Sequence, residues 1–244
     1  MLFYIIIFTF IGSILSLVGS FFLLIKHDIT ELFSNQLVNF AAGVLIAVAF
    51  LDLLPEASEL VGGSNIFLPV LLGFISFFFA ERFIQWFHYH HGHGQKSNIL
   101  LILVGDGVHN FIDGVAIAAS FLTSIPLGIT TSLAVAAHEI PQEIADMGVL
   151  LTGGLSKSKA LLYNSISALT ALAGAVLAFF FASLIEPYLY VFLALTAGFF
   201  IYIAAADLIP QLHEEFAKNR KFSPVLMFVL GIFLVFAFGK IFEG

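Results

Sequence analysis

Two apolar stretches of the sequence carry a concentration of side chains that bind metal ions. They contain Asp106, His109, Asn110 and Asp113, and then His138, Glu139, Gln142, Glu143 and Asp146. Imidazole nitrogens and carboxylate oxygens together suit divalent ions such as Zn(II), Fe(II) and Mn(II). Cysteine is absent from the chain, so any metal must be held by nitrogen and oxygen atoms.

The spacing of these side chains places them on shared helix faces. Residues four apart project from one side of a helix, and three pairs have this spacing: His109 with Asp113, His138 with Gln142, and Glu139 with Glu143. Asp106 lies about one turn before the first pair, and Asp146 extends the last pair by another turn. Two half-sites that face each other could therefore hold two ions that share a carboxylate.

The composition of the whole chain is that of an integral membrane protein. Of its 244 residues, 60% are hydrophobic and only 10% are charged, whereas a soluble domain has about 25% charged residues. Apolar blocks of about 20 residues alternate with short polar joints, and a helix of that length crosses a bilayer core of roughly 30 Å. The first block, MLFYIII onward, lacks a basic leader, so we expect a retained first span.

We expect an all-α fold with about eight transmembrane helices in a single transmembrane domain, residues 1–244. The predicted spans are Leu2 to Ile25, Leu37 to Leu54, Ile66 to Phe87, Ile99 to Leu122, Pro126 to Leu151, Ala160 to Leu184, Tyr188 to Ile209, and Pro224 to Phe242. Each charged residue at mid-membrane costs roughly 3 kcal/mol, so five carboxylates in the fourth and fifth spans would cost on the order of 15 kcal/mol. Neither span contains lysine or arginine. Bound protons or a metal ion must therefore neutralise the negative charge of these carboxylates.

Basic residues predict the orientation of the chain, because lysine and arginine stay on the cytoplasmic side. Eight of the nine lie at alternate joints: Lys26, Arg82, Lys96, Lys157, Lys159, Lys218, Arg220 and Lys221. Only Lys240 lies on the other side. Both termini are therefore expected to face outward.

A repeated pattern relates the second span to the seventh. Ala42-Gly43 leads after nine residues to Asp52-Leu-Leu-Pro55, and Ala197-Gly198 leads after nine to Asp207-Leu-Ile-Pro210. Because the two spans differ by an odd number of crossings, the copies point in opposite directions, which is typical of transporters built from inverted repeats. Asp52 is then expected at the outer end and Asp207 at the inner end. Alternatively, each Asp-x-x-Pro only closes a helix at the membrane interface.

These motifs resemble those of the ZIP (zinc/iron permease) transporter family. Asp106-Gly-Val-His109-Asn110-Phe-Ile-Asp113-Gly is similar to the family's fourth-helix signature, and His138-Glu139-Ile-Pro-Gln142-Glu143 is similar to its fifth-helix signature. Asp52-Leu-Leu-Pro-Glu56 and Ala197-Gly…Asp207-Leu-Ile-Pro210 extend the likeness over nearly the whole chain.

The resemblance implies a metal centre of two ions between the fourth and fifth helices, transport of divalent metal toward the cytoplasm, and a homodimer in the plasma or inner membrane. By position, it implies that the metal ligands are His109, Asn110, Asp113, His138, Glu139 and Gln142, with Glu143 beside them. Gln142 departs from the family pattern, which has histidine or glutamate there. A neutral amide is a weaker ligand, which affects metal preference at one site.

The joint at residues 88–98 holds four of the eight histidines, namely His88, His90, His91 and His93. Alternating histidine and glycine is typical of a flexible chelating strand. We therefore predict an auxiliary metal-binding loop on the cytoplasmic side, with a solvated linker as the alternative.

Two other functions would use the same residues. An intramembrane zinc metalloprotease would need His-Glu-x-x-His, but Gln142 stands in place of the second histidine and Pro141 lies inside the motif. His109 could supply the missing nitrogen. An outward metal/proton antiporter would share the chemistry and differ in direction. Carboxylates that continue to Asp146 favour a transport path over hydrolysis.

We therefore expect uptake of a divalent metal rather than an enzymatic reaction. Metal would enter near Asp52, bind at the centre, and leave along a path past Asp106, Glu143, Asp146 and Asp207. The expected substrate is Zn²⁺, with Fe²⁺, Mn²⁺ or Cd²⁺ as alternatives and no organic cofactor. The net charge of −7 does not favour a nucleic-acid partner, so the expected partners are metal ions and the lipid bilayer.

Overall fold

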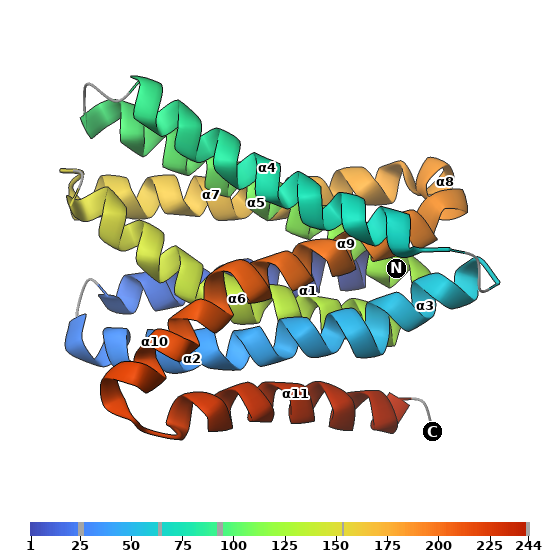
Figure 1. Ribbon diagram of the computed structural model, residues 1–244. Coiled ribbons are helices and arrows are strands. Elements are labelled where there is room, and N and C mark those ends of the chain that lie inside the picture. The colour runs from blue at the N-terminus through green and yellow to red at the C-terminus, as the bar shows by residue number, and fades with distance from the viewer. Residues whose placement is uncertain (24–26, 63–64, 92–94, 153, 243–244) are drawn as a thin grey trace.

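The computed structural model describes residues 1–23, 27–62, 65–91, 95–152 and 154–242, and this part of the chain forms helices without a strand. The helices are α1 (Leu2–Leu23), α2 (His27–Ala47), η1 (Val48–Leu53), α3 (Leu54–Leu60), α4 (Phe67–His91), α5 (Gln95–Thr123), α6 (Ile125–Thr152), α7 (Lys157–Phe180), α8 (Ala182–Ile185), η2 (Glu186–Tyr188), α9 (Leu189–Ile203), η3 (Ala204–Leu208), α10 (Ile209–Asn219) and α11 (Ser223–Phe242). They lie roughly side by side in one bundle (Figure 1). The predicted all-α fold is confirmed.

The eight predicted spans all correspond to helical segments, although several helices are longer than predicted. The second span begins at His27 instead of Leu37, and the seventh continues to Asn219 instead of Ile209. The added turns are polar, for example in α10, and the apolar pattern of a sequence marks only the part of a helix that lies in hydrocarbon.

Four helical segments of the described chain are long and apolar enough to cross a membrane, namely Gln36–Leu60, Lys157–Phe180, Ala182–Ala217 and Ser223–Ile241. Leu2–Val18 and Phe67–Ala80 are shorter apolar helices. With 29 and 28 residues, α5 and α6 are about 40 Å long at 1.5 Å per residue. Their polar residues lower their hydropathy. The protein is therefore a multi-pass integral membrane protein.

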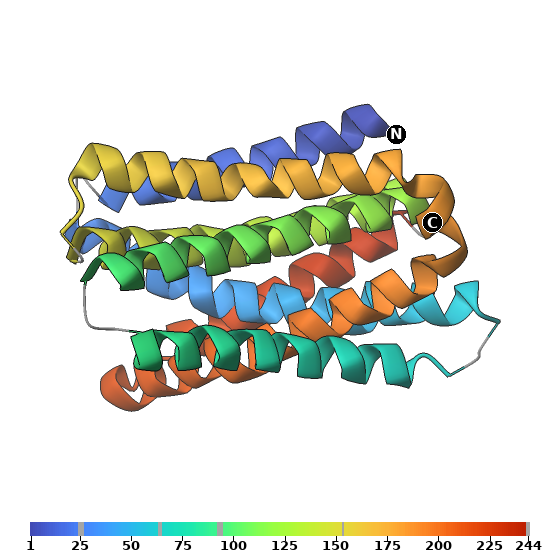
Figure 2. The same cartoon turned by 90° about the horizontal axis from the view of Figure 1, so that it is seen from above.

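Both termini lie at one end of the bundle (Figures 1 and 2). At the opposite end, α1 leads to α2, α4 to α5, α6 to α7, and α10 to α11. These are the joints that hold most of the basic residues. The location of both termini on one side of the membrane agrees with the distribution of basic residues. That this side faces outward stays a prediction.

The repeat seen in the sequence has a structural counterpart. Asp52 lies in the π-helical turn η1 and Asp207 in the π-helical turn η3. Both helices continue after the following proline, so Asp-x-x-Pro does not end a helix, and π-turns are frequent at functional sites. In Figure 1, α2 and α9 run in opposite directions.

Reciprocal glycine contacts support the inverted repeat. A Cβ at Gly43 of α2 would overlap the Phe228 carbonyl of α11, and one at Gly198 of α9 would overlap the Val70 carbonyl of α4. The partner helices return the contact, through Gly231 in α11 and Gly73 in α4, each against backbone of α2 or α9. Matching helices of the two halves thus pack backbone to backbone.

The same kind of contact joins α5 to α7. A Cβ on Gly114 would overlap the Ala171 carbonyl, and a Cβ on Gly174 would overlap the Phe111 carbonyl. Four glycines flank the metal-binding residues in the sequence, namely Gly105, Gly107, Gly114 and Gly148, and small residues there could let α5 and α6 approach closely. Gly114 instead faces α7, and a Cβ on Gly148 would have nothing within 4 Å. Periodicity alone does not identify which neighbour a small residue faces.

The predicted His-rich loop is mostly helical. Helix α4 extends to His91 and α5 begins at Gln95, so His88 and His90 belong to the last turns of α4 and not to a linker. The side chains of these histidines, and the whole of His93, lie outside the described residues. Metal binding by this segment stays a prediction.

Orientation can be tested with reporter fusions at the C-terminus. Because that end is predicted to face outward, we expect a C-terminal alkaline phosphatase fusion to be active in a bacterial host and a C-terminal green fluorescent protein fusion to stay dark. A bright fluorescent fusion with an inactive phosphatase would reverse the assignment.

Gly114→Ala should destabilise the protein, because the new methyl group would overlap the backbone of α7. We expect a loss of about 1–3 kcal/mol in unfolding free energy, the usual cost of overpacking. Thermal unfolding in detergent measures the change. Gly148→Ala, which adds a methyl group where there is open space, is the matched control. Equal unfolding temperatures for the two variants would contradict the packing described.

Candidate metal centre

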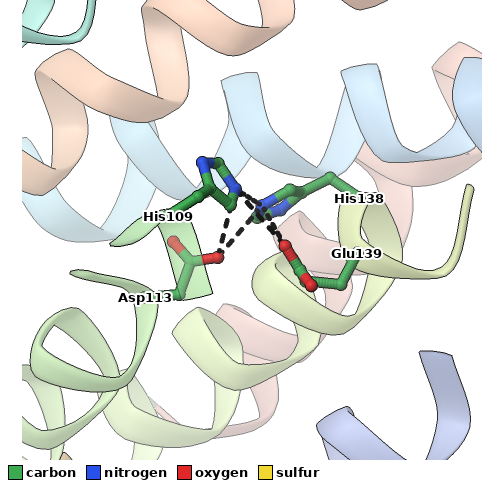
Figure 3. Close-up of side chains that lie close together, drawn as sticks. All are labelled: His109, Asp113, His138 and Glu139. Carbon is green, nitrogen blue, oxygen red and sulfur yellow. Dashed lines mark hydrogen bonds and ion pairs between the residues drawn. The ribbon is translucent and has the colours of Figure 1, made fainter. Parts of the chain in front are cut away.

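The centre is built on two neighbouring helices whose polar residues face each other. His109 and Asp113 are one turn apart on α5, and His138 and Glu139 are consecutive on α6. Figure 3 shows these four side chains converging on one point. The structure thus brings residues of the fourth and fifth spans together, where the sequence predicted two facing half-sites.

The four converging side chains bring four ligand atoms into a small cluster. The Nε2 atoms of His109 and His138 are 3.2 Å apart. His109 Nε2 lies 3.4 Å from Asp113 Oδ2 and 3.3 Å from Glu139 Oε1. His138 Nε2 lies 3.3 Å and 3.7 Å from the same two oxygens. An ion with four tetrahedral ligands at roughly 2.0–2.1 Å separates its ligands by about 3.3 Å. The cluster has the dimensions of a tetrahedral zinc site.

Because the cluster is buried, its ionised carboxylates are energetically unfavourable unless a cation is bound. Asp113 is 4% exposed and Glu139 is 3% exposed. Asp113 Oδ2 and both oxygens of Glu139 have no hydrogen-bond donor in the described chain apart from the two imidazoles. Buried carboxylates in such surroundings need a positive charge, and a divalent ion between the four ligand atoms would supply it.

Neighbouring groups fix the direction of the imidazole rings. His138 Nδ1 lies 3.0 Å from the carbonyl oxygen of Ala134, which only accepts, so Nδ1 carries the proton and Nε2 keeps its lone pair for a metal. The His138 ring also contacts Phe200 of α9 edge to face, with centroids 6.1 Å apart. Phe77 of α4 contacts the His109 ring in the same way at 5.3 Å. Helices α4 and α9 thus position the two rings.

A second group of ligand atoms adjoins the first. Asp106, Glu139 and Glu143 each bring one carboxylate oxygen to within 4.8 Å of the others. Glu139 belongs to both groups. All three side chains are buried, and Glu143 is 0% exposed. The sharing of Glu139 agrees with the expectation that two adjoining sites have a carboxylate in common.

Two residues that the family resemblance implied as ligands, Asn110 and Gln142, form hydrogen bonds with Asp106. The Asn110 amide nitrogen donates to Asp106 Oδ1 at 3.0 Å and to the Asp106 carbonyl at 3.2 Å. The Gln142 amide nitrogen donates to the same Oδ1 at 3.3 Å. Both amides therefore lie beside the two groups of ligand atoms, with their NH₂ groups directed at a carboxylate.

A cavity of about 470 Å³, here called the inner cavity, opens beside the centre. Its polar lining includes Asp106, His109, Gln142, Asp146 and Asp207. Asp106, Asp146 and Asp207, which were predicted to lie on the transport path, therefore line one cavity together with His109. Since Asp207 comes from η3, the π-turn of the seventh span delivers a carboxylate to the space next to the centre.

A second cavity of about 340 Å³, here called the outer cavity, lies at the end of the bundle that holds the termini. It is lined by Asp52 and by Glu56 and Glu59 of α3. Of these three acids, only Asp52 had an expected role in the transport path. The spacing of the three acids, four and then three residues apart, places them on one helix face and could have identified them. The two cavities share no lining residue.

Comparison with known proteins gives the chain its family. The family model described as ZIP zinc transporter matches residues 1–99 and 88–239, nearly the entire chain. The chain belongs to the ZIP zinc transporter family. Within this family, it combines the cluster of two histidines and two carboxylates with an amide at Gln142.

The relatives named in this family are larger proteins. The chain is 40% identical over 129 residues to zinc transporter ZIP10 of Danio rerio, covering 52% of this chain and 15% of that protein. It is 43% identical over 130 residues to human zinc transporter ZIP4, covering 53% and 19%. It is 38% identical over 152 residues to zipt-7.2 of Caenorhabditis elegans, covering 58% and 31%. The matching region is thus less than a third of each of these relatives.

Removal of one imidazole should weaken zinc binding severely. We expect His109→Ala and His138→Ala each to lower the affinity for Zn²⁺ more than about 100-fold, because even groups that only orient a ligand contribute 10- to 100-fold. Calorimetry on the purified protein measures this. His213→Ala, an exposed histidine on α10, is the control. Unchanged affinity in both centre variants would exclude the imidazoles as ligands.

Proposed function

We propose that this chain transports divalent metal ions, with Zn²⁺ as the main substrate, across the membrane toward the cytoplasm. The observation that carries the proposal is the buried cluster of two imidazole nitrogens and two carboxylate oxygens with the spacing of a tetrahedral ion. The names of the relatives, which are zinc transporters, support Zn²⁺ as the substrate. Fe²⁺, Mn²⁺ and Cd²⁺ are further candidate substrates, because imidazole and carboxylate bind all of them.

The transport path in this proposal runs from the outer cavity to the inner cavity through the centre. Asp52, with Glu56 and Glu59, attracts cations at the outer end. The ion then exchanges its waters for His109, Asp113, His138 and Glu139. It leaves past Asp106, Glu143, Asp146 and Asp207, three of which line the inner cavity.

The two cavities support transport by alternating access. His109 lines the inner cavity, so the centre is open on that side. Between Thr130 at the outer cavity and His138 at the centre, α6 is packed with buried side chains such as Thr131, whose hydroxyl donates to Ser120 of α5 at 2.9 Å. Metal entry from the outer side therefore requires this packed region to open, which corresponds to a second conformation.

The geometry gives no support to hydrolysis. In a zinc protease, the glutamate of the motif activates water and does not bind the metal. Here a Glu139 oxygen lies 3.3 and 3.7 Å from the two imidazole nitrogens, among the candidate ligands. We therefore assign no enzymatic reaction to the chain. The homodimer implied by the family would add no ligand to this centre, because all four side chains come from one chain.

Transport by purified protein in liposomes tests the proposal. We expect Zn²⁺ uptake by the unaltered protein and a reduction of about tenfold or more for His109→Ala and Asp113→Ala, because each removes a ligand from a four-ligand site. His213→Ala should transport normally. Uptake that is equally fast in both centre variants would refute the assigned centre. If the protein moved Zn²⁺ only outward, and only when a proton gradient was applied, the result would favour the outward metal/proton antiporter.

A further inference from the structure

Lys240 is the basic residue that the charge pattern separates from the other eight, and it lies beside the outer cavity. A small cavity of about 160 Å³, here called the side cavity, is lined by Lys240 and by Asp52. Asp52 and Gly239 also line the outer cavity. A Cβ on Gly239 would have nothing within 4 Å, so no side chain fills the space at this residue. The two cavities therefore adjoin, with Asp52 common to both.

Backbone packing fixes the position of Lys240 relative to Asp52. Lys240 lies in the last turn of α11, and Asp52 lies in η1, which continues α2. A Cβ on Gly231 of α11 would overlap the Phe40 carbonyl of α2. This close contact sets the register of the two helices, which lie side by side in Figure 1. The end of α11 is thereby held next to η1.

The direction of the Lys240 side chain is not that of a lysine at a membrane interface. Lysines near the end of a membrane helix usually extend toward water, and they also favour the carbonyl groups at a helix C-terminus. The Lys240 Nζ atom instead lies 5.9 Å from the centre of the Phe236 ring, one turn deeper along α11. Phe236 lines the side cavity as well. The ammonium group therefore lies back along the helix, at the cavity that contains Asp52.

Lys240 changes the charge of the outer opening. Asp52, Glu56 and Glu59 line the outer cavity and carry three negative charges when ionised. With the single positive charge of Lys240 in the adjoining side cavity, the sum is −2. The linings of the two cavities, as far as the structure describes them, contain no further lysine or arginine. The net charge therefore equals the charge that one divalent ion neutralises.

We propose that Lys240 is a tethered counter-ion of the outer cavity, which pairs with Asp52 when no metal is present and yields this carboxylate to a divalent ion, so that monovalent cations do not fill the cavity. This inference deepens the proposed transport function and rests on it. It makes Lys240 a residue that determines specificity at the entrance, without a role as a metal ligand.

A tethered ammonium group selects by charge. K⁺ carries the same single charge, so it gains little by replacing Lys240 at Asp52, and the tether keeps the ammonium at a high local concentration. A divalent ion interacts twice as strongly with a carboxylate at the same distance, so it can displace the ammonium. The Phe236 ring, within the range of a cation–π contact, offers the displaced ammonium a second position.

Zn²⁺ uptake in two external salts of equal ionic strength tests the proposal. Potassium chloride supplies a small competing cation, whereas N-methylglucamine chloride screens charge equally and is too bulky to compete well. We expect the unaltered protein to have the same KM for Zn²⁺ in both salts. Lys240→Met should have a KM about fivefold higher in K⁺, the scale expected for charges a few ångströms apart in water. Lys240→Arg should behave like the unaltered protein.

The matched control is Lys221→Met, which removes the same charge from the exposed turn before α11, at the other end of that helix. Its KM should not depend on the choice of salt. If Lys240→Met is equally indifferent to K⁺, the proposal is overturned and Lys240 serves only as an interfacial residue. A lower turnover number in Lys240→Met with no salt-specific change in KM has the same meaning, because it indicates a structural role.

Chemical labelling tests the same pairing without transport. We expect Zn²⁺ to increase the rate of acetylation of Lys240 in the purified protein at least about twofold, because the ion frees the ammonium from Asp52. Mass spectrometry measures the rate, with Lys221 as the internal reference. In Asp52→Asn, Lys240 should react at the fast rate with or without Zn²⁺. In His109→Ala, the response to Zn²⁺ should persist, because the metal centre is not involved. A Lys240 rate that Zn²⁺ does not alter would contradict the pairing.

These measurements separate the inference from the proposed function. A protein whose Lys240 responds to Zn²⁺ as expected, but which moves no Zn²⁺ into liposomes, would refute transport and leave the counter-ion assignment intact. A protein that transports Zn²⁺ with the same KM in both salts after Lys240→Met would refute the counter-ion assignment and leave transport intact.

Discussion

The poor solvation of carboxylates within a membrane is the constraint on which this structure depends. Acidic side chains on α5 and α6 lie where water is scarce, and an unpaired charge there is expensive. No lysine or arginine occurs in the two apolar spans that carry them. Everything around the cluster can be understood as support for it: two imidazoles, two amides, and the aromatic rings of Phe77 and Phe200 that orient the imidazoles. Stability and cation binding are therefore linked in one place.

The rest of the bundle serves to bring α5 and α6 to a fixed separation. Helix α7 holds α5 through backbone contact at Gly114 and Gly174, while α4 and α9 contact each other through Gly73 and Gly198. Such contacts tolerate little sideways displacement, since even one methyl group would overlap a carbonyl. The π-turns η1 and η3 then place an acid at each cavity. The inverted repeat thus gives two cavities related by the same local architecture.

Much of this arrangement could be predicted from the sequence, because its causes are local. Apolar blocks identified the spans, basic joints predicted that both termini share a side, and the i,i+4 pairs predicted the facing half-sites. What could not be predicted depends on tertiary neighbours. The position of Gly114 in the sequence does not indicate whether this residue faces α6 or α7. The presence of an amide at Asn110 and at Gln142 does not indicate whether its oxygen or its NH₂ group faces the centre. Polar helix extensions such as α10 leave no hydrophobic signal.

The sharing of Glu139 has a consequence for how the two ions would affect each other. The two groups together contain four carboxylates, from Asp106, Asp113, Glu139 and Glu143. Two divalent ions would bring four positive charges and leave the centre neutral, whereas one ion would leave it with two excess negative charges. Departure of one ion from a filled centre thus strengthens the attraction for the next. A centre with this charge balance would favour exchange of ions over complete emptying, so the arrival of a new ion and the release of the previous one become parts of a single event.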